Sequence, residues 1–403
     1  MIVLVLNCGS SSVKYQVFDM REETCLASGM MDRVGTSEAI LTYQPTGKPS
    51  QKTSGEALDH AQAIDQILAI LADPKRDGVL TDRSQIKALG HRVVHGGEDF
   101  TQSALIDSTV LDEIRECIEL APLHNPANLK GIQACARVLP GVPQVAVFDT
   151  AFHQTMPERA FLYAPPYVLY KRHKVRRYGF HGTSHKYVYE RMEQLSGRAD
   201  CSGLRVVTCH LGNGASIAAV KGGKVYDTSM GLTPLEGLVM GTRCGDIDPA
   251  VPLYLMAKEE LSLSQVNTLM NKHSGLIGIS GVSSDMRQII KEAGEGHKNA
   301  RLALDIFCYR LRKYIGAYAT ALGGLDAIVF TGGIGQNAKP VRALTCEDLS
   351  FMGVQVDAEA NEACDGKKDA CISKPNSPVQ VWVIPTNEEL VIARDTARIV
   401  GKA

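Results

Sequence analysis

Residues 6–19 read LNCGSSSVKYQVFD, and this stretch predicts a β-hairpin very close to the start of the chain. An apolar run at 2–6 leads into it, and apolar residues alternate with polar ones after the turn, as in a half-buried strand. Asn7 stands before the small, serine-rich turn and Lys14 follows it. Because such a turn offers backbone N–H groups, hydroxyls, an amide and a cation, it predicts a place where an anion binds.

The same pattern returns in the middle of the chain. Residues 205–227 read RVVTCHLGNGASIAAVKGGKVYD, which predicts strand, Gly-Asn-Gly turn, strand, Gly-Gly turn and strand. The opening stretch also continues into a third strand, near 25–31. We interpret the two stretches as an internal repeat and predict two copies of one α/β unit. Strands elsewhere alternate with helices, for example the helix expected at 300–322, which is typical of an α/β protein.

Length and composition exclude several classes of protein. A chain of 403 residues predicts two domains. Its 43 basic and 44 acidic residues give a net charge of −1, which argues against general nucleic-acid binding. The sequence has no membrane-length apolar run and no signal-peptide pattern at its start. The eleven cysteines are scattered without a zinc-like C-x-x-C pair, so we expect reduced thiols in a cytosol.

Three glycine-rich turns each follow a predicted strand: NCGSSS at 7–12, HLGNGAS at 210–216 and TGGIGQN at 331–337. One such turn usually means a tight bend. Three of them, two in matching repeats, favour the phosphates of a nucleotide held between two domains. None completes G-x-x-x-x-G-K-[ST] or G-x-G-x-x-G, so the sequence predicts neither a P-loop nor a dinucleotide fingerprint.

Two arginines lie in glycine-containing contexts. Arg92 precedes a Gly-Gly turn in GHRVVHGG, and Arg243 lies in MGTRCGDIDP. A guanidinium presents a planar fork that fits carboxylate or phosphoryl oxygens. The alternative for Arg243 is a structural salt bridge to Asp246 or Asp248.

Carboxylates are expected near two strand ends, at Asp149 and at the pair Glu388 and Glu389. A phosphoryl-transfer site needs Mg²⁺, which prefers oxygen ligands, and the amide of Asn7 would add another. The alternative for the two glutamates is the first turn of a capped helix.

Five of the eleven histidines stand beside glycine or proline, in positions that packing alone does not predict: His91, His95, His124, His181 and His210. No i, i+4 pair with an acidic third ligand is present among them, which argues against zinc.

Eight ordered motifs, from about residue 2 to 398, closely resemble those of the acetate kinase family, within the superfamily of acetate and sugar kinases, heat-shock ATPases and actin. They are NCGSSSVK, GHRVVHGG, FHGTSH, HLGNGAS, MGTRCGDIDP, SSDMR, GGIGQN and PTNEEL. The resemblance implies a duplicated ribonuclease-H-like α/β fold with an active-site cleft between the domains. These would be 1–150 plus 386–403, and a nucleotide-binding domain at 151–385. It also implies a homodimer that transfers a phosphoryl group between ATP and acetate, giving ADP and acetyl phosphate, with Mg²⁺ or, in substitution, Mn²⁺, and the cysteines predict a cytoplasmic location.

The resemblance also assigns roles to single residues. Arg92, Asp149, His181 and Arg243 would be catalytic, with His124 in support, and Asn7 and Glu388 would hold the metal. Arg92, Val94, Leu123, Phe180 and Pro234 would bind acetate. The nucleotide would contact Lys14, His210, Leu211, Gly212, Asn213, Gly214, Asp285, Met286, Arg287, Gly333, Ile334, Gly335, Gln336 and Asn337. Members of the family usually carry Glu where this chain has Gln336.

The chemistry explains these residue types. An ionised carboxylate needs no general base, so catalysis is positioning plus neutralisation of charge, and we expect direct in-line transfer. The alternative mechanism passes through an acyl phosphate on Asp149 or Glu388. Alternative functions are a kinase for propionate or another short carboxylate, and a nucleotide-switched, actin-like scaffold without this activity.

Overall fold

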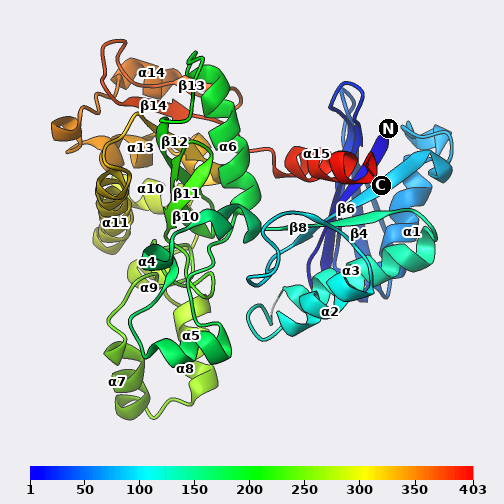
Figure 1. Cartoon of the computed structure of the whole chain (residues 1–403), viewed down its shortest axis with the longest axis horizontal. Coiled ribbons are helices and arrows are strands. Elements are labelled where there is room, and N and C mark those ends of the chain that lie inside the picture. Colours follow the sequence, from blue (N-terminus) through cyan, green and yellow to red (C-terminus); the bar gives the residue numbers. More distant parts are fainter. Residues whose placement is uncertain (123, 403) are drawn as a thin grey trace. The chain divides into compact units, whose positions relative to one another are not determined.

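The computed structural model describes residues 1–122 and 124–402 (Figure 1). The chain forms two compact units. Unit 1 contains Met1–Phe152 and the C-terminal segment from Asn387, and unit 2 contains His153–Thr386. The chain therefore leaves unit 1 and later returns to it.

Within the described residues, unit 1 holds an eight-stranded sheet in the order β5-β4-β3-β2-β1-β6-β8-β7. Its strands are β1 (Ile2–Cys8), β2 (Ser12–Asp19), β3 (Thr24–Asp32), β4 (Thr36–Pro45), β5 (Gln51–Ala57), β6 (Ile86–Val93), β7 (Ala104–Leu105) and β8 (Gln144–Phe148). The strands from β1 to β5 pair in antiparallel fashion, so the predicted hairpin at 6–19 is present. β1, β6 and β8 are parallel, and their carboxyl ends therefore lie at one edge.

The helices of unit 1 cover both faces of this sheet. They are α1 (His60–Leu71), α2 (Ser108–Glu116), α3 (Asn125–Val138) and α15 (Glu388–Val400), with short 3-10 turns η1 (Pro74–Arg76) and η2 (Arg83–Gln85). Leu4 and Leu6 of β1 share a core with Ile64 of α1 and Ala134 of α3. Since successive strand residues point to opposite faces, the buried Val3 faces the other side, where α15 contacts β1, β6 and β8. Burial on both faces explains the continuous apolar run.

Close contact between α15 and the sheet depends on one glycine. A Cβ on Gly90 of β6 would lie 2.5 Å from Thr396 Oγ1 and 2.6 Å from Ile392 Cγ2. The Asn387 side chain caps α15 by accepting from Leu390 N at 3.1 Å. The strand, the cap and the helix together fix where the glutamates at the start of α15 lie.

Unit 2 repeats the plan with a six-stranded sheet, again counted over the described residues, in the order β11-β10-β9-β12-β14-β13. Its strands are β9 (Arg205–Leu211), β10 (Ala215–Lys221), β11 (Lys224–Thr228), β12 (Ala327–Thr331), β13 (Ala370–Cys371) and β14 (Gln380–Val383). The helices are α4 (Glu158–Phe161), α5 (Tyr167–His173), α6 (Gly182–Leu195), α7 (Ala250–Lys258), α8 (Leu263–Lys272), α9 (Gly275–Ser280), α10 (Met286–Gly294), α11 (Lys298–Leu322), α12 (Gly332–Asn337), α13 (Lys339–Cys346) and α14 (Ala358–Ala363). The 3-10 turn η4 (Ser350–Met352) also belongs to unit 2, and η3 (Ala151–Thr155) crosses the boundary between the two units.

The two sheets match strand by strand, which confirms the predicted duplication. The order β3-β2-β1-β6-β8-β7 corresponds to β11-β10-β9-β12-β14-β13, with the same parallel and antiparallel pairs. The turn after β1 and the turn after β9 are therefore equivalent positions in the two copies.

One local prediction was wrong. The sequence GGIGQN forms the short helix α12 rather than an open turn, and Gly332 begins it with φ +73°. The segment 356–378 contains α14 and the edge strand β13, which pairs with β14. Over the described residues, no helix combines the length and apolar character that a membrane crossing requires.

Candidate functional site

The first group of predicted site residues lies at the carboxyl edge of the parallel strands in unit 1. Asn7 is near the end of β1, Arg92 near the end of β6, and Asp149 directly after β8. The backbone N–H of Asp149 donates to the carbonyl of Val93 at 2.9 Å, which continues the ladder beyond the strand. The parallel register therefore brings together residues that are far apart in the sequence.

Arg92 and Asp149 form a bidentate ion pair. Arg92 Nε donates to Oδ1 at 2.9 Å and Nη2 donates to Oδ2 at 2.6 Å. Asp149 is 1% exposed. Burial lowers the pKa of Arg92, but the carboxylate of Asp149 outweighs it and holds that pKa above its usual range. The ion pair uses Nε and Nη2 of Arg92, so Nη1 is the nitrogen that can contact a ligand.

The start of α15 adds two carboxylates to this group. The charges of Glu388 and Glu389 act on Arg92, and the charge of Glu388 acts on Asp149. Burial raises the pKa of Glu389, while Arg92 and Lys14 lower it. Sequence reasoning assigned only Glu388 to the site, although the adjacent Glu389 was a visible signal. Both glutamates also lie in the first turn of α15, so helix capping and the charged cluster coexist.

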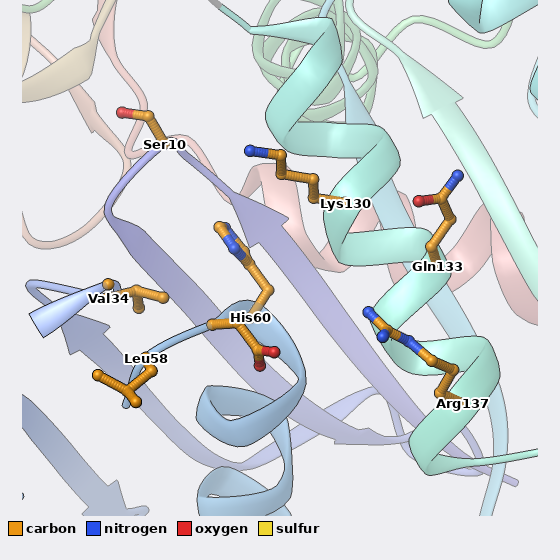
Figure 2. Close-up of a pocket in the computed structure, with 9 residues that line it drawn as sticks. Ser10, Val34, Leu58, His60, Lys130, Gln133 and Arg137 are labelled. Atoms are coloured by element: carbon orange, nitrogen blue, oxygen red, sulfur yellow. The ribbon is translucent and has the colours of Figure 1, made fainter. Parts of the chain in front are cut away.

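The turn after β1 is held from two helices. The Cys8 carbonyl accepts from Asn128 Nδ2 of α3 at 3.0 Å, and the Gly9 carbonyl lies 2.8 Å from His60 Nε2 of α1. A cavity of about 340 Å³ adjoins this turn, and Figure 2 shows Lys130 and Arg137 facing His60 across it. Hydrogen bonds from α1 and α3 therefore fix the position of the turn.

In unit 2, His181, His210 and Arg243 converge on the turn after β9. The rings of His181 and His210 stack with centroids 4.3 Å apart. A Cβ on Gly214 would lie 3.3 Å from Arg243 Nη1 and 3.6 Å from His181 Cε1. His181 has φ +56°, a left-handed conformation that is uncommon for a residue with a side chain. Strain of this kind is frequent at functional sites.

A hydrogen-bonded network fixes these rings. Ser216 Oγ lies 2.9 Å from His181 Nδ1 and 2.7 Å from His185 Nε2, and Ser184 Oγ lies 2.7 Å from His210 Nδ1. Burial holds the pKa of His185 well below its usual value, so that ring stays neutral. His210, expected to bind nucleotide, therefore lies beside His181.

Arg243 has no ion-pair partner anywhere in the described part of the chain. Its Nη1 donates to the Pro234 carbonyl at 3.1 Å, and burial lowers its pKa. Asp246, the expected alternative partner, instead accepts from Gly237 N at 2.8 Å and from Tyr314 OH at 2.7 Å. A half-buried cation without a carboxylate partner is a place for an anionic ligand.

Unit 2 contains a cavity of about 570 Å³, which is lined by residues of three predicted nucleotide motifs. It is lined by Gly212, Asn213, Asp285, Met286, Arg287, Ile290, Gly333, Ile334, Asn337, Ala338, Lys339 and Pro340. Ile290 and the segment 338–340 were missed, since they belong to helix faces with no motif.

Other predicted nucleotide contacts lie elsewhere. Leu211, Gly214, Gly335 and Gln336 are not lining residues of this cavity, and Lys14 belongs to unit 1. The carbonyls of Gly335 and Gln336 accept from the buried Arg342 at 3.0 and 2.7 Å, and the Gln336 side chain is half-buried.

The apolar residues expected around the acetate methyl group are distributed over both units. Val94 of unit 1 is buried, as is Phe180 of unit 2, and Pro234 is half-buried. Leu123 lies outside the described residues.

The duplicated α/β fold, the cavity lined by glycine-rich motifs and Arg243, which has no ion-pair partner within 1–122 and 124–402, are typical of nucleotide-dependent phosphotransferases. Within that class the chain belongs to the acetokinase family, whose model matches residues 2–394. It is 55% identical to the acetate kinase of Dictyoglomus thermophilum over 403 residues, with both chains fully covered. The crystal structure of Porphyromonas gingivalis acetate kinase has a TM-score of 0.94 at 48% identity, and that of a Francisella tularensis propionate kinase has 0.90 at 41%, each with 99% of both chains covered.

Proposed function

We propose that this protein transfers the γ-phosphoryl group of ATP to acetate, reversibly, giving ADP and acetyl phosphate. The observation that carries the proposal is Arg243: a half-buried guanidinium with no carboxylate partner in the part of the chain that the structure describes, next to His181 and the turn at Gly214. Phosphoryl transfer spreads negative charge over three equatorial oxygens, and such a cation stabilises that charge without any movement. Membership of the acetokinase family supports the same reaction.

The nucleotide would occupy the cavity of about 570 Å³ in unit 2. Its lining combines glycines and Asn213, which let a backbone approach phosphates, with apolar atoms of Met286, Ile290 and Ile334 that suit a base. The position of this cavity beside the turn after β9 supports γ-phosphate contacts at Arg243 and His181.

Acetate would bind at Arg92. Because Asp149 occupies Nε and Nη2, the contact to acetate falls to Nη1, and Asp149 acts by fixing the plane of the guanidinium. The residues expected around the methyl group are Val94, Phe180 and Pro234, together with Leu123, which lies outside the described residues.

We propose that a magnesium ion would bind at the carboxyl edge of the sheet in unit 1. The Asn7 amide and the Glu388 carboxylate would hold it, with Asp149 ordering its water, because Mg²⁺ and Mn²⁺ prefer such oxygen ligands. When bound, the ion neutralises phosphate charge. The acetate carboxylate is already a nucleophile, so no residue of the chain needs to act as its base.

We also propose that the protein is a cytoplasmic homodimer. Helices α7 and α8, which contact one another, expose a group of large apolar side chains that we name the α7–α8 face: Val251, Leu253, Tyr254 and Leu263. Leu253 is 69% and Leu263 75% exposed, and exposed apolar side chains on neighbouring helices are typical of an interface between protein chains. All eleven cysteines are free thiols, which supports a reducing compartment.

Production of acyl phosphate from ATP and short carboxylic acids, trapped as the hydroxamate, tests the function directly. The expected order of kcat/KM is acetate above propionate above butyrate. A preference for propionate would instead assign the second candidate, a propionate kinase, which the likeness to the Francisella tularensis enzyme favours. ATP hydrolysis with no acyl phosphate would support a nucleotide-switched scaffold and overturn the proposal.

The path of transfer has its own test. Inversion at a chiral γ-phosphorus is expected for one in-line displacement. Retention would require two displacements and an acyl phosphate on Asp149 or Glu388.

A further inference from the structure

Two irregular segments of unit 2 carry the residues assigned to substrate. They are 177–181, with Phe180 and His181, and 229–246, with Pro234 and Arg243. The backbone N–H groups of Tyr178 and Gly179 donate to the Gly231 carbonyl at 3.0 and 3.4 Å, so the segments are neighbours. Since both are outside helices and strands, other contacts must fix their positions.

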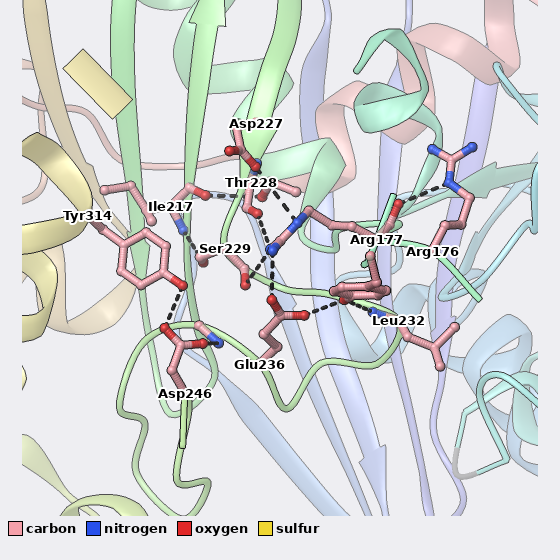
Figure 3. A network of polar contacts seen from close by, with 12 residues as sticks. Arg176, Arg177, Ile217, Asp227, Thr228, Ser229, Leu232, Glu236, Asp246 and Tyr314 are labelled. Carbon is pink, nitrogen blue, oxygen red and sulfur yellow. Dashed lines mark hydrogen bonds and ion pairs between the residues drawn. The ribbon is translucent and has the colours of Figure 1, made fainter. Parts of the chain in front are cut away.

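Arg177 supplies the first of these contacts (Figure 3). Its Nη1 donates to the carbonyls of Thr228 and Ser229 at 2.6 and 3.1 Å, and its Nη2 donates to Glu236 Oε1 at 2.6 Å. The guanidinium of Arg177 therefore connects segment 177–181 to the start of segment 229–246. Its side chain is 16% exposed, so water competes little for these bonds.

Tyr163 closes the same cluster. Its hydroxyl donates to Glu236 Oε2 and accepts from Leu232 N at 3.0 Å. Burial first, and then the charge of Glu236, raise the pKa of Tyr163 above its usual value, so the hydroxyl keeps its proton. Gly231 lies against this pair, because a Cβ there would collide with both Tyr163 and Glu236. We name Arg177, Tyr163 and Glu236 the Arg177 cluster.

The Arg177 cluster is linked to the guanidinium of Arg243 through Pro234. Leu232, which the cluster holds, and Glu236, which belongs to it, flank Pro234, whose carbonyl accepts from Arg243 Nη1 at 3.1 Å. Among the described residues, Met240 Sδ at 3.6 Å is the other hydrogen-bond partner of the Arg243 side chain. The position of the Arg243 guanidinium therefore depends on the position of the Pro234 carbonyl.

A separate anchor holds the far end of the segment. Asp246 accepts from Gly237 N at 2.8 Å and from Tyr314 OH of α11 at 2.7 Å, and it pairs with Arg310 at 3.3 Å. Gly237 has φ +108°, a conformation that favours glycine. The segment thus has two anchors with the substrate residues between them.

We propose that the Arg177 cluster positions Arg243 for catalysis, with Tyr163, Arg177 and Glu236 as positioning residues that do not touch substrate. This inference rests on the proposed function, since it assigns Arg243 to the transferred phosphoryl group. A displacement of a charged group by about 1 Å lowers the rate of such a reaction by up to about a hundredfold.

The test is a double-mutant cycle between Tyr163→Phe and Arg243→Ala, with acyl phosphate production as the readout. Tyr163→Phe keeps the ring and removes only the hydroxyl. We expect kcat to fall about tenfold or more while KM for ATP changes less than about twofold. In the Arg243→Ala background the same substitution should change kcat less than about twofold, because the group that it positions is gone. Glu236→Gln is the second variant, with the same expected pattern.

Tyr226→Phe is the matched control, since this half-buried tyrosine of β11 has no hydrogen bond to its hydroxyl among the described residues. Equal loss of kcat from Tyr163→Phe in both backgrounds would overturn the proposal and assign the cluster to general folding. So would a loss confined to KM, or a loss matched by Tyr226→Phe. Failure of the proposed function is distinguishable, because the unmodified protein would then make no acyl phosphate.

Discussion

Arg92 and Asp149 face each other through two parallel hydrogen bonds, of 2.9 and 2.6 Å, at the edge of unit 1. Arg92→Ala should abolish most activity, about 10³-fold in kcat/KM, and should also destabilise unit 1 by about 3 kcal/mol by leaving a buried carboxylate unpaired. The double variant, Arg92→Ala with Asp149→Ala, should recover much of that stability because the unpaired carboxylate is gone, but it should remain inactive. Urea unfolding with kinetics checks this, and equal instability of the single and double variants would contradict the coupling.

Arg243→Ala should lower kcat by about 10³-fold or more while leaving KM for ATP nearly unchanged. The reason is that Arg243 lies next to the turn at Gly214 but is not a lining residue of the nucleotide cavity. Steady-state kinetics with varied ATP measures both constants. A change confined to KM would show that Arg243 binds substrate in the ground state instead.

Gly333→Leu should raise KM for ATP by about tenfold or more and leave the fold stable. Among the described residues, a Cβ at Gly333 meets no atom within 4 Å apart from its chain neighbours and the backbone of its own helix. Gly333 lines the cavity, so a new side chain would enter the space assigned to the nucleotide. The matched control is Gln336→Glu, which introduces the residue that the resemblance led us to expect there. We expect it to change KM less than about twofold, because Gln336 is not a lining residue.

Mild acid should destabilise the protein through buried histidines. Burial lowers the pKa of His91 and of His153 to about 4, whereas an unfolded histidine titrates near 6.5. As pH falls from about 6.5 to about 4, the unfolded state binds protons that the folded state does not, so stability falls by roughly 1.4 kcal/mol per pH unit for each histidine. Urea midpoints at pH 7 and 5 measure this. His91→Gln should flatten the dependence, and a change at the exposed His173 should not.

Leu253→Glu should convert the proposed dimer to monomers, because it places a charge within the α7–α8 face. Light scattering coupled to size-exclusion chromatography gives the mass. Phe351→Glu is the control, since Phe351 is 81% exposed but belongs to η4. A wild-type mass of one chain would overturn the dimer and leave the chemistry untouched.

The repeat in the sequence predicted the duplicated sheets because strand periodicity and turn composition are local properties. The sequence also predicted that Arg92 and Asp149 lie near strand ends, since each lies in or directly after a recognisable strand. Their pairing was not, because it depends on the parallel register of β6 and β8. The helical form of α12 was missed because three glycines in six residues normally oppose a helix. Arg177 gave no signal, since its partners Thr228, Ser229 and Glu236 are more than fifty positions away along the chain.

The return of the chain to unit 1 has a consequence for synthesis on the ribosome. β1 is translated first, yet the face that carries Val3 is covered by α15, which is translated near the end. Unit 2 has no such dependence, because all its strands come from one continuous segment. Unit 2 should therefore complete its folding before unit 1 does. The strands of unit 1 must avoid aggregating until residues 388–400 emerge from the ribosome.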